Sequence, residues 1–189
     1  MDKAAVFIDG GYLSKVLKLV FSETRIDYEK FSNKLCEGCE RWRTYYYDCM
    51  PLLPNNPTEQ DKERYAGKQR FIDRLKRLNR FEIRLGKLIQ IPDRDRPIQK
   101  GVDVLLSVDL TRMSWDKQIQ KAILVTGDSD FVPAVIAAKD AGVLVITYYS
   151  RGAPDVYAHD ALLTCCDERY EIKQPLIDQA LFQRVVSRC

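Results

Sequence analysis

The chain has 189 residues, of which 46% are hydrophobic and 30% charged, and its formal net charge is +3 at pH 7. This length suits one globular domain with a substantial buried core and leaves little room for a second full domain. No apolar run approaches the roughly 18 residues that span a bilayer, and the start MDKAAVFIDG lacks the apolar segment of a signal peptide. We therefore expect a cytoplasmic protein with no membrane association, whose six cysteines are reduced.

The first fifty residues alternate strand and helix patterns. Val6 to Ile8 is a short apolar run that ends at Asp9-Gly-Gly, and residues 12–20 carry apolar side chains at helical spacing. Residues 27–35 favour a second helix, capped by the aspartate at its start. Residues 42–47 favour a strand, and the proline-rich stretch that follows marks a loop.

A long basic helix is predicted next. Thr58 to Asp61 resembles a capping box and opens a helix that we expect to reach about Asn79. After it we expect, in order, a strand at 81–85, a turn at Gly86, a second short strand at 88–91 and a charged loop at 92–97.

The second half repeats the alternation of helix and strand. We expect, in order, a helix at 102–115, a buried strand at 122–125, a helix at 131–141, a buried strand at 143–148 and a helix at 155–165. Continuous apolar strands that alternate with helices indicate a parallel sheet covered on both faces. The predicted fold class is α/β: a three-layer α/β/α domain with a mainly parallel central sheet over residues 1–172. Residues 173–189 are then a C-terminal tail in which a short helix can form.

Four aspartates follow or precede these elements at one predicted edge of the sheet. The first strand ends at Asp9, and the strand at 122–125 is followed by Thr-Gly-Asp128-Ser-Asp130. Asp103 lies at the start of a helix and so can face the same edge, where open parallel sheets bind ligands. Two carboxylates 5 Å apart repel by about 3 kcal/mol at an effective dielectric near 20. Such a cluster favours a hard divalent cation, Mg²⁺ or Mn²⁺ rather than Zn²⁺, because the motifs contain no histidine.

Each aspartate also has a structural interpretation. Asp128 or Asp130 can cap the helix that contains Pro133, Asp103 can favour the start of its own helix, and Asp9 can serve its turn. Taken singly, each is explained better in this way. Three separate segments that bring aspartates to one edge favour the metal site instead.

Positive charge is concentrated between residues 61 and 100, where thirteen Lys and Arg stand against six Asp and Glu. Carboxylate-held cations beside a basic surface are typical of phosphodiester chemistry. We expect the basic helix and the charged loop to hold a phosphate backbone, largely without contacting bases, although a charged helix is also commonly a solvated face. The expected contacts are Lys68, Arg70, Arg74, Arg94 and Arg96.

Together these motifs resemble the NYN domain of the PIN-like nuclease superfamily, in its LabA-like bacterial branch. The matching segments are Val6-Phe-Ile-Asp9-Gly-Gly-Tyr-Leu13, Lys100-Gly-Val-Asp103-Val with Asp109, Leu124-Val-Thr-Gly-Asp128-Ser-Asp130-Phe131 with Pro133, and Gly142 with Val145. Leu162 to Tyr170 is similar to the family's closing helix, with Asp167 at an acidic position. The resemblance covers nearly the whole chain up to about residue 172.

The resemblance implies a metal-dependent ribonuclease, and more narrowly an endoribonuclease, that hydrolyses RNA phosphodiester bonds. Its catalytic and metal-binding residues would be Asp9, Asp103, Asp128 and Asp130. By the family pattern, Asp9 and Asp128 are the closest ligands of Mg²⁺ or Mn²⁺, and the other two complete the cluster directly or through water. Lys100 is expected to contact a scissile or flanking phosphate. The implied partner is single-stranded or structured RNA, and the oligomeric state is left open, a homo-oligomer included.

One position departs from the family pattern. Many relatives carry Asn or Ser shortly after the first aspartate, where this chain has Gly11-Tyr12 and so lacks a side-chain contact to metal or substrate. The alternative hypothesis is a catalytically weak or inactive RNA-binding or regulatory module that acts through a protein partner.

Overall fold

The structure is a computed structural model that describes residues 1–89 and 98–182; the side chains of Ile89 and residues 98–100 lie outside the description. The strands are β1 Lys3–Asp9, β2 Glu40–Cys49, β3 Phe81–Ile89, β4 Ile98–Lys100, β5 Lys121–Val125, β6 Leu144–Tyr149 and β7 Glu168–Glu171. The α-helices are α1 Gly10–Leu19, α2 Tyr28–Leu35, α3 Glu59–Lys76, α4 Val102–Trp115, α5 Val132–Asp140, α6 Asp160–Cys165 and α7 Gln174–Gln179. Two 3₁₀ helices, η1 Ser129–Phe131 and η2 Pro154–Val156, complete the described part.

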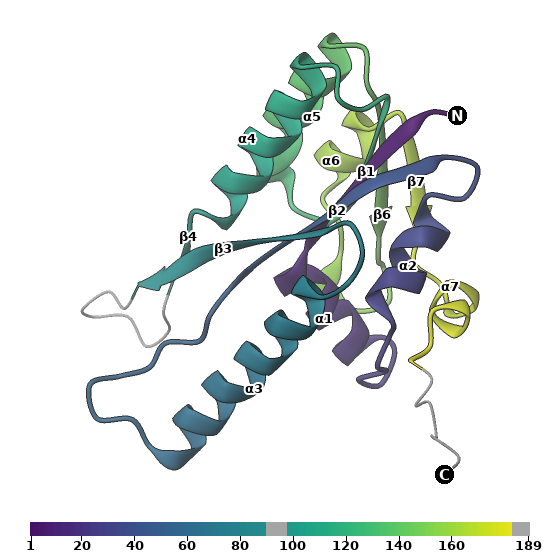
Figure 1. Ribbon diagram of the computed structural model, residues 1–189. Coiled ribbons are helices and arrows are strands. Elements are labelled where there is room, and N and C mark those ends of the chain that lie inside the picture. Colours follow the sequence, from purple (N-terminus) through teal and green to yellow (C-terminus); the bar gives the residue numbers. More distant parts are fainter. Residues whose placement is uncertain (90–97, 183–189) are drawn as a thin grey trace.

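The strands form one twisted sheet in the order β4-β3-β2-β1-β5-β6-β7 (Figure 1). All neighbouring strands are parallel except β3 and β4, which pair antiparallel. Chain order runs outward from β1 in both directions, so strand order reverses beside β1 and β5. Ligands bind at such a point, at the carboxyl ends of the strands.

Helices cover both faces of the sheet, and each face has its own apolar core. On one side, α1, α2, α3 and α7 pack on alternate residues of β1 and β5, such as Val6 and Ile123. On the other side, α4, α5 and α6 pack on the residues between them, such as Phe7 and Leu124. This arrangement confirms the predicted three-layer α/β/α class. Within the described residues, no helix is both long and apolar enough to cross a membrane.

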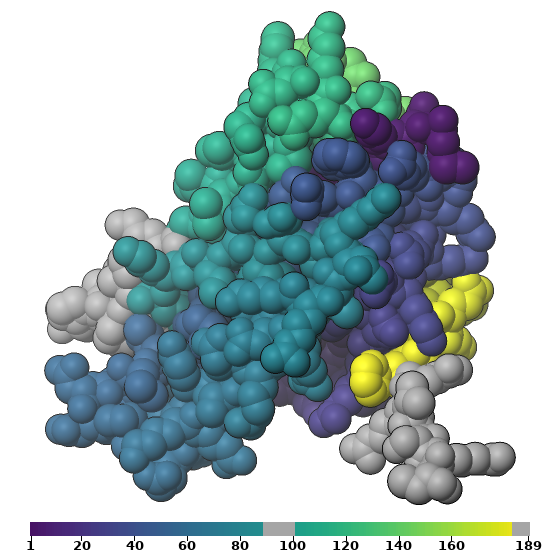
Figure 2. All heavy atoms as spheres, viewed as in Figure 1, coloured from purple at the N-terminus to yellow at the C-terminus, as the bar shows by residue number. Residues whose placement is uncertain are grey.

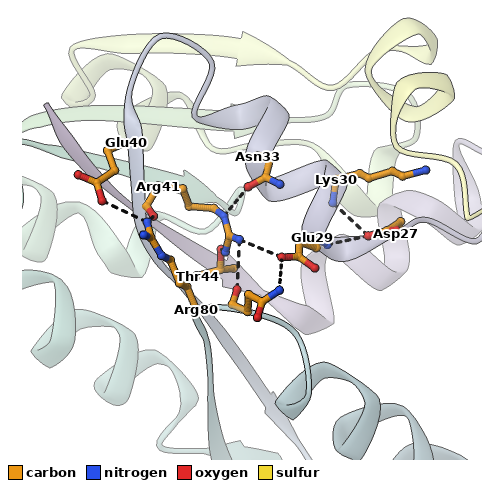
Figure 3. A network of polar contacts seen from close by, with 9 residues as sticks. Asp27, Glu29, Lys30, Asn33, Glu40, Arg41, Thr44 and Arg80 are labelled. Atoms are coloured by element: carbon orange, nitrogen blue, oxygen red, sulfur yellow. Dashed lines mark hydrogen bonds and ion pairs between the residues drawn. The ribbon is translucent and has the colours of Figure 1, made fainter. Parts of the chain in front are cut away.

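A buried arginine joins α2 to the start of β2 and β3 (Figure 3). Arg41 donates to Asn33 Oδ1 at 2.6 Å, to Thr44 Oγ1 at 3.2 Å and to the Asn79 carbonyl oxygen at 3.1 Å, and it forms an ion pair with Glu29 at 3.5 Å. The residue is only 9% exposed. Because burying a charge is unfavourable unless the charge is paired and hydrogen-bonded, these partners make the position specific for arginine.

Three local predictions are wrong. Gly86 does not turn the chain into a second strand at 88–91, because β3 continues through it to Ile89; Gln90 and Ile91 lie outside the described residues. The helix expected at 155–165 is divided into η2 and α6 by residues 157–159, of which Tyr157 and His159 are extended. The expected closing helix at 162–170 ends at Cys165, and β7 follows as an edge strand paired with β6.

Candidate active site

The carboxyl ends of β1 and β5 lie side by side and carry the first candidate residues. Ile8 pairs with Val125, so Asp9 and Thr126 leave the two strands at the same level. Asp9 also pairs with Tyr47 of β2. The edge of the sheet therefore brings together segments that are more than a hundred residues apart in the chain.

Asp9 is the N-cap of α1 and is held by two hydrogen bonds. The backbone N–H of Tyr12 donates to Oδ1 at 3.0 Å, as expected for a cap, and Thr126 Oγ1 donates to Oδ2 at 3.4 Å. Thr126 is fully buried and also accepts from the backbone N–H of Asp128 at 3.3 Å. One hydroxyl thus couples the orientation of Asp9 to the loop that carries Asp128.

The pKa of Asp9 is raised from 3.8 to about 6. Burial is the largest cause, and the negative charges of Asp103 and Asp48 add to it, whereas the hydrogen bonds from Tyr12 and Thr126 act in the opposite direction. The carboxylate therefore lies in an environment that disfavours its own charge, as is common at functional sites.

The other three predicted carboxylates lie on the same edge. Asp128 is the N-cap of η1, where its Oδ1 accepts from the backbone N–H of Asp130 at 2.9 Å. Asp103 lies in the first turn of α4. Its pKa is raised by partial burial and by the nearby charges of Asp128 and Asp130. The negative charge of Asp103 also raises the pKa of Asp9. Asp103 therefore interacts electrostatically both with Asp9 and with the pair Asp128 and Asp130.

These four carboxylates lack the positive partner that Asp48, Asp109 and Asp167 have. Among the side chains that the structure describes, no Lys or Arg forms an ion pair with Asp9, Asp103, Asp128 or Asp130. Asp48, in contrast, pairs with Lys68. The buried Asp109 pairs with Arg84 and Arg112 on the α4 face, and Asp167 pairs with Lys139. The four aspartates thus form a group of negative charges that no described Lys or Arg side chain neutralises.

Asp48 is a site-proximal residue that the motifs do not single out. It lies near the end of β2, is 4% exposed, and accepts hydrogen bonds from Tyr46 Oη at 3.0 Å and from Lys68 Nζ. A Cβ placed on Gly10 would lie 2.5 Å from Tyr46 Oη and 2.7 Å from Asp48 Oδ2. The turn after Asp9 therefore packs directly on this pair. A tyrosine run followed by an aspartate, inside what looks like an ordinary strand, gives no local signal for such a role.

Tyr12 lies where many family members carry a polar residue. In this chain it has a structural role at the carboxyl ends of the strands. Its hydroxyl accepts from the backbone N–H of Ser150 at 2.8 Å and donates to the carbonyl of Val156 at 3.1 Å. A Cβ on Gly127 would lie 2.7 Å from its ring. Tyr12 therefore connects α1 to the loops after β5 and β6, and its hydroxyl group is occupied by these structural hydrogen bonds.

Two basic residues predicted to contact RNA project freely from α3. Arg70 and Arg74 are exposed, and no ion pair to either occurs among the described side chains. Lys68 is turned inward to Asp48 and also lies 5.5 Å from the centre of the Phe71 ring. Lys100 pairs through its backbone with Lys87, but its side chain lies outside the description, as do Arg94 and Arg96 entirely.

Two acids that share the family pattern lie elsewhere. Asp109, on α4, accepts from Tyr47 Oη of β2 at 3.0 Å, between the helix and the sheet. Asp167 accepts from the backbone N–H of Val145 at 2.8 Å, near the start of β6. It therefore lies at the amino ends of the strands, opposite the carboxyl ends where the four aspartates lie. Both have structural partners and neither joins the four carboxylates.

The donor chemistry of the edge fits a hard divalent cation. Carboxylate oxygens are the ligands that Mg²⁺ prefers, and the pKa values of Asp9 and Asp103 are raised first by burial and then by the charges of neighbouring carboxylates. Within the described part of the chain, no three Asp, Glu, His or Cys side chains are arranged closely enough to hold a metal ion. The carboxylates thus share an edge and an electrostatic field without a preformed ligand shell.

The fold and this acidic edge define a class: a three-layer α/β/α domain of the PIN-like type, with aspartates at the carboxyl ends of the central strands. Residues 3–173 match the NYN domain, and the chain belongs to the NYN domain family. The family lies within the PIN-like nuclease superfamily, whose members are generally hydrolases.

A search of curated proteins gave no match. Among solved structures, the fold is similar to that of a protein of unknown function from Vibrio parahaemolyticus, with a TM-score of 0.66 and 23% sequence identity over 96% of each chain. At this identity the likeness shows the fold alone.

Proposed function

We propose that the chain is an Mg²⁺- or Mn²⁺-dependent endoribonuclease whose active site is formed by Asp9, Asp103, Asp128 and Asp130. We place it in the LabA-like branch of the family, on the motifs that suggested the family. The proposal goes beyond the family assignment by naming the metal class, the substrate and the four residues.

One observation carries the proposal: three separate segments bring carboxylates to the switch point of the sheet, and no described cation pairs with them. Asp48, Asp109 and Asp167, which lie elsewhere in the same chain, each have an ion-pair partner. Asp9 and Asp128 are also helix caps, whereas Asp103 lies in the first turn of α4, whose N-cap is Gly101. A bound divalent cation would supply the missing charge.

The chain's own residues would divide the work. Asp9, fixed by Tyr12 and Thr126, and Asp128, fixed by Thr126 and η1, would bind the cation. Asp103 and Asp130 would bind it directly or through water. When bound, such a cation lowers the pKa of an attacking water and stabilises the leaving oxyanion.

Basic residues outside the cluster would hold the RNA backbone. Arg70 and Arg74 are exposed on α3, and Lys100 precedes the helix that carries Asp103. Contacts to phosphates fix the position of a strand without selecting its sequence. We therefore propose that these contacts place a phosphodiester against the acidic edge.

The test is cleavage of labelled RNA by the purified protein in Mg²⁺ or Mn²⁺. Asp9→Asn and Asp128→Asn each remove one carboxylate charge without changing side-chain size. We expect each to reduce the cleavage rate by at least about 100-fold, as is typical when a group that stabilises the transition state is removed.

Asp140→Asn is the matched control, because Asp140 is an exposed aspartate at the end of α5, at the other edge of the sheet. It should cleave as the wild type does. Equal activity of the wild type and both site variants, or no metal-dependent cleavage across single-stranded and structured RNAs, would contradict the nuclease proposal. RNA binding without cleavage would support the regulatory alternative.

A further inference from the structure

A cavity on the face opposite α4 is lined by apolar, aromatic and basic side chains. It has a volume of about 380 Å³ and lies among the end of α1, the start of α2, the second half of α3 and the last described residue, Phe182. Its apolar walls include Tyr28, Phe71, Leu78 and Phe182, and Arg25 and Arg74 also line it. Volumes of this size are typical of sites for small organic groups.

The cavity is open at an aromatic side. Phe182 is 54% exposed although it is a large apolar side chain. Its position is fixed by its backbone N–H, which donates to the carbonyl of Arg25 at 3.1 Å. On the inner side, the rings of Tyr28 and Phe71 lie edge to face at 5.4 Å. A planar ligand would therefore meet aromatic surface on the inner wall and at the rim.

The charges at the cavity favour an anion. The side chains of Arg25 and Arg74 are exposed and form no ion pair among the described residues. Among the described residues of the lining, the one acid is Asp27, which is the N-cap of α2 and accepts from the backbone N–H groups of Glu29 and Lys30 at 3.0 Å each. Arg74 also lines a neighbouring groove of about 540 Å³ with Arg70, Arg77 and Asp73, and Asp73 forms an ion pair with Lys76 at 3.6 Å. A strip of guanidinium groups thus runs along α3 to the cavity, and α3 and the end of the described chain lie on the same visible face (Figure 2).

The cavity is connected to the acidic edge through packed rings. The Tyr46 ring lies 5.7 Å from that of Tyr28 and 5.8 Å from that of Phe71, and its hydroxyl donates to Asp48 beside Gly10. On α3, Lys68 at the edge and Arg74 at the cavity are six residues apart, which is about 9 Å along a helix. A strand of nucleotides held by α3 can therefore reach both places.

We infer that this cavity binds one unpaired nucleotide of an RNA strand, with the base among the aromatic walls and the backbone phosphates on Arg70, Arg74 and Arg77. Aromatic side chains that stack on bases, beside a basic groove that follows the backbone, are the features that bind single strands without regard to sequence. The inference rests on the proposed function for its substrate and adds preference for unpaired RNA. It extends the RNA contacts to Phe182, Arg25 and Arg77.

The test measures binding rather than cleavage. The full chain is titrated in EDTA against a fluorescently labelled single-stranded RNA oligonucleotide and against the same sequence annealed to its complement. We expect the single strand to bind more tightly. Phe182→Ala should weaken single-strand binding about 5-fold or more, the lower end of what one stacked base contributes. Trp115→Ala is the matched control, since Trp115 is 60% exposed on α4, across the sheet, and it should bind as the wild type does.

A second pair of variants tests the charges. Arg74→Gln should weaken single-strand binding and lower the slope of log K against log salt by about 1. Lys117→Gln, an exposed lysine after α4, should leave the slope unchanged. A fluorescent base analogue within the strand should change its emission on binding to the wild type and not to Phe182→Ala.

Four results would overturn the inference: equal affinities of Phe182→Ala and Trp115→Ala, equal slopes of Arg74→Gln and Lys117→Gln, duplex RNA that binds as tightly as the single strand, and a change in emission of the base analogue that is the same with the wild type and with Phe182→Ala. Loss of these effects with metal-dependent cleavage intact would reject the cavity alone. Absence of cleavage with these effects intact would reject the nuclease proposal alone.

Discussion

Asp9 shows how a single side chain carries opposing structural demands. As a cap it stabilises the start of α1 through the N–H of Tyr12, but burial and the charges of Asp103 and Asp48 raise its pKa to about 6. The ionised form is therefore tolerated at neutral pH at the expense of stability. Functional sites commonly contain such groups.

The first prediction concerns this pKa. Because folded Asp9 keeps its proton to about pH 6 while the unfolded chain releases it near 3.8, the folded state binds more protons between these values. The free energy of unfolding should then fall as pH rises from 4 to 6, by about 3 kcal/mol at most. Asp9→Asn should lack this fall. Urea unfolding in EDTA from pH 4 to 8 measures it, and a constant difference between wild type and variant would rule out the raised pKa.

Gly10 gives a second prediction at the same turn. An Ala side chain there would collide with Tyr46 and Asp48, so Gly10→Ala should destabilise the protein by about 1–3 kcal/mol and reduce cleavage. Gly67→Ala in α3 is the control, because its Cβ would lie 3.9 Å from the nearest side-chain atom, on Arg70. That change should stabilise by about 0.5–1 kcal/mol. If Gly10→Ala leaves the unfolding midpoint unchanged or raises it, the packing of Gly10 on Tyr46 and Asp48 does not contribute to stability.

Individual residues of the site were predictable only where they end or begin an element. Asp9, Asp128 and Asp130 follow apolar strands, and the rule for parallel sheets then places them at one edge. Asp48 and Thr126 were not identified, because their importance depends on which side chains lie opposite them across strands. Metal binding by the four aspartates stays a prediction.

At the level of elements, the Arg41 network fixes how α2 meets β2 and β3 (Figure 3). Arg41→Met keeps most of the aliphatic stem but leaves Asn33, Thr44 and the Asn79 carbonyl without their donor. We expect a loss of about 2–4 kcal/mol in the free energy of unfolding, measured with a chemical denaturant.

Arg43→Met is the control for Arg41. Arg43 lies on the same strand, its side chain is 40% exposed, and it pairs with Glu82. Exposed ion pairs contribute little, so the change should be below about 1 kcal/mol. Similar losses for Arg41→Met and Arg43→Met would mean that burial of the network does not matter.

Most helices and central strands followed from periodicity and caps, including the capping box of Thr58 and Asp61 that opens α3. Two of the three wrong predictions are cases in which strand pairing overrides local preference. Gly86 pairs with Cys49 of β2 and so continues β3. β7 has the sequence ERYE, with no alternation of apolar and polar residues. It forms because its backbone pairs with β6.

On the scale of the whole molecule, the net charge is small but the positive charge is unevenly distributed along the chain. The excess of Lys and Arg between residues 61 and 100 lies partly on α3, beside the cavity and near the acidic edge. Net charge alone therefore gave no indication of a polyanion partner, whereas its distribution along the chain did.

Charge reversal on α3 should therefore weaken RNA binding at every sequence. Arg70→Glu or Arg74→Glu should each reduce the slope of log K against log salt by about 1 or more, because each removes a cation that neutralises a phosphate. Lys68→Glu should act differently: because Lys68 pairs with buried Asp48, it should also lower the unfolding temperature. Binding titrations at 50–200 mM salt test this, and unchanged slopes would place the RNA path on another face.

The central claim is that the acidic edge binds a divalent cation. Its most direct test is a crystal structure of the protein soaked in Mn²⁺, with anomalous scattering used to locate the ion. We predict an anomalous peak among Asp9, Asp103 and Asp128 in the wild type that is absent from Asp9→Asn. A well-ordered edge with no peak there, or a peak that persists unchanged in Asp9→Asn, would contradict it.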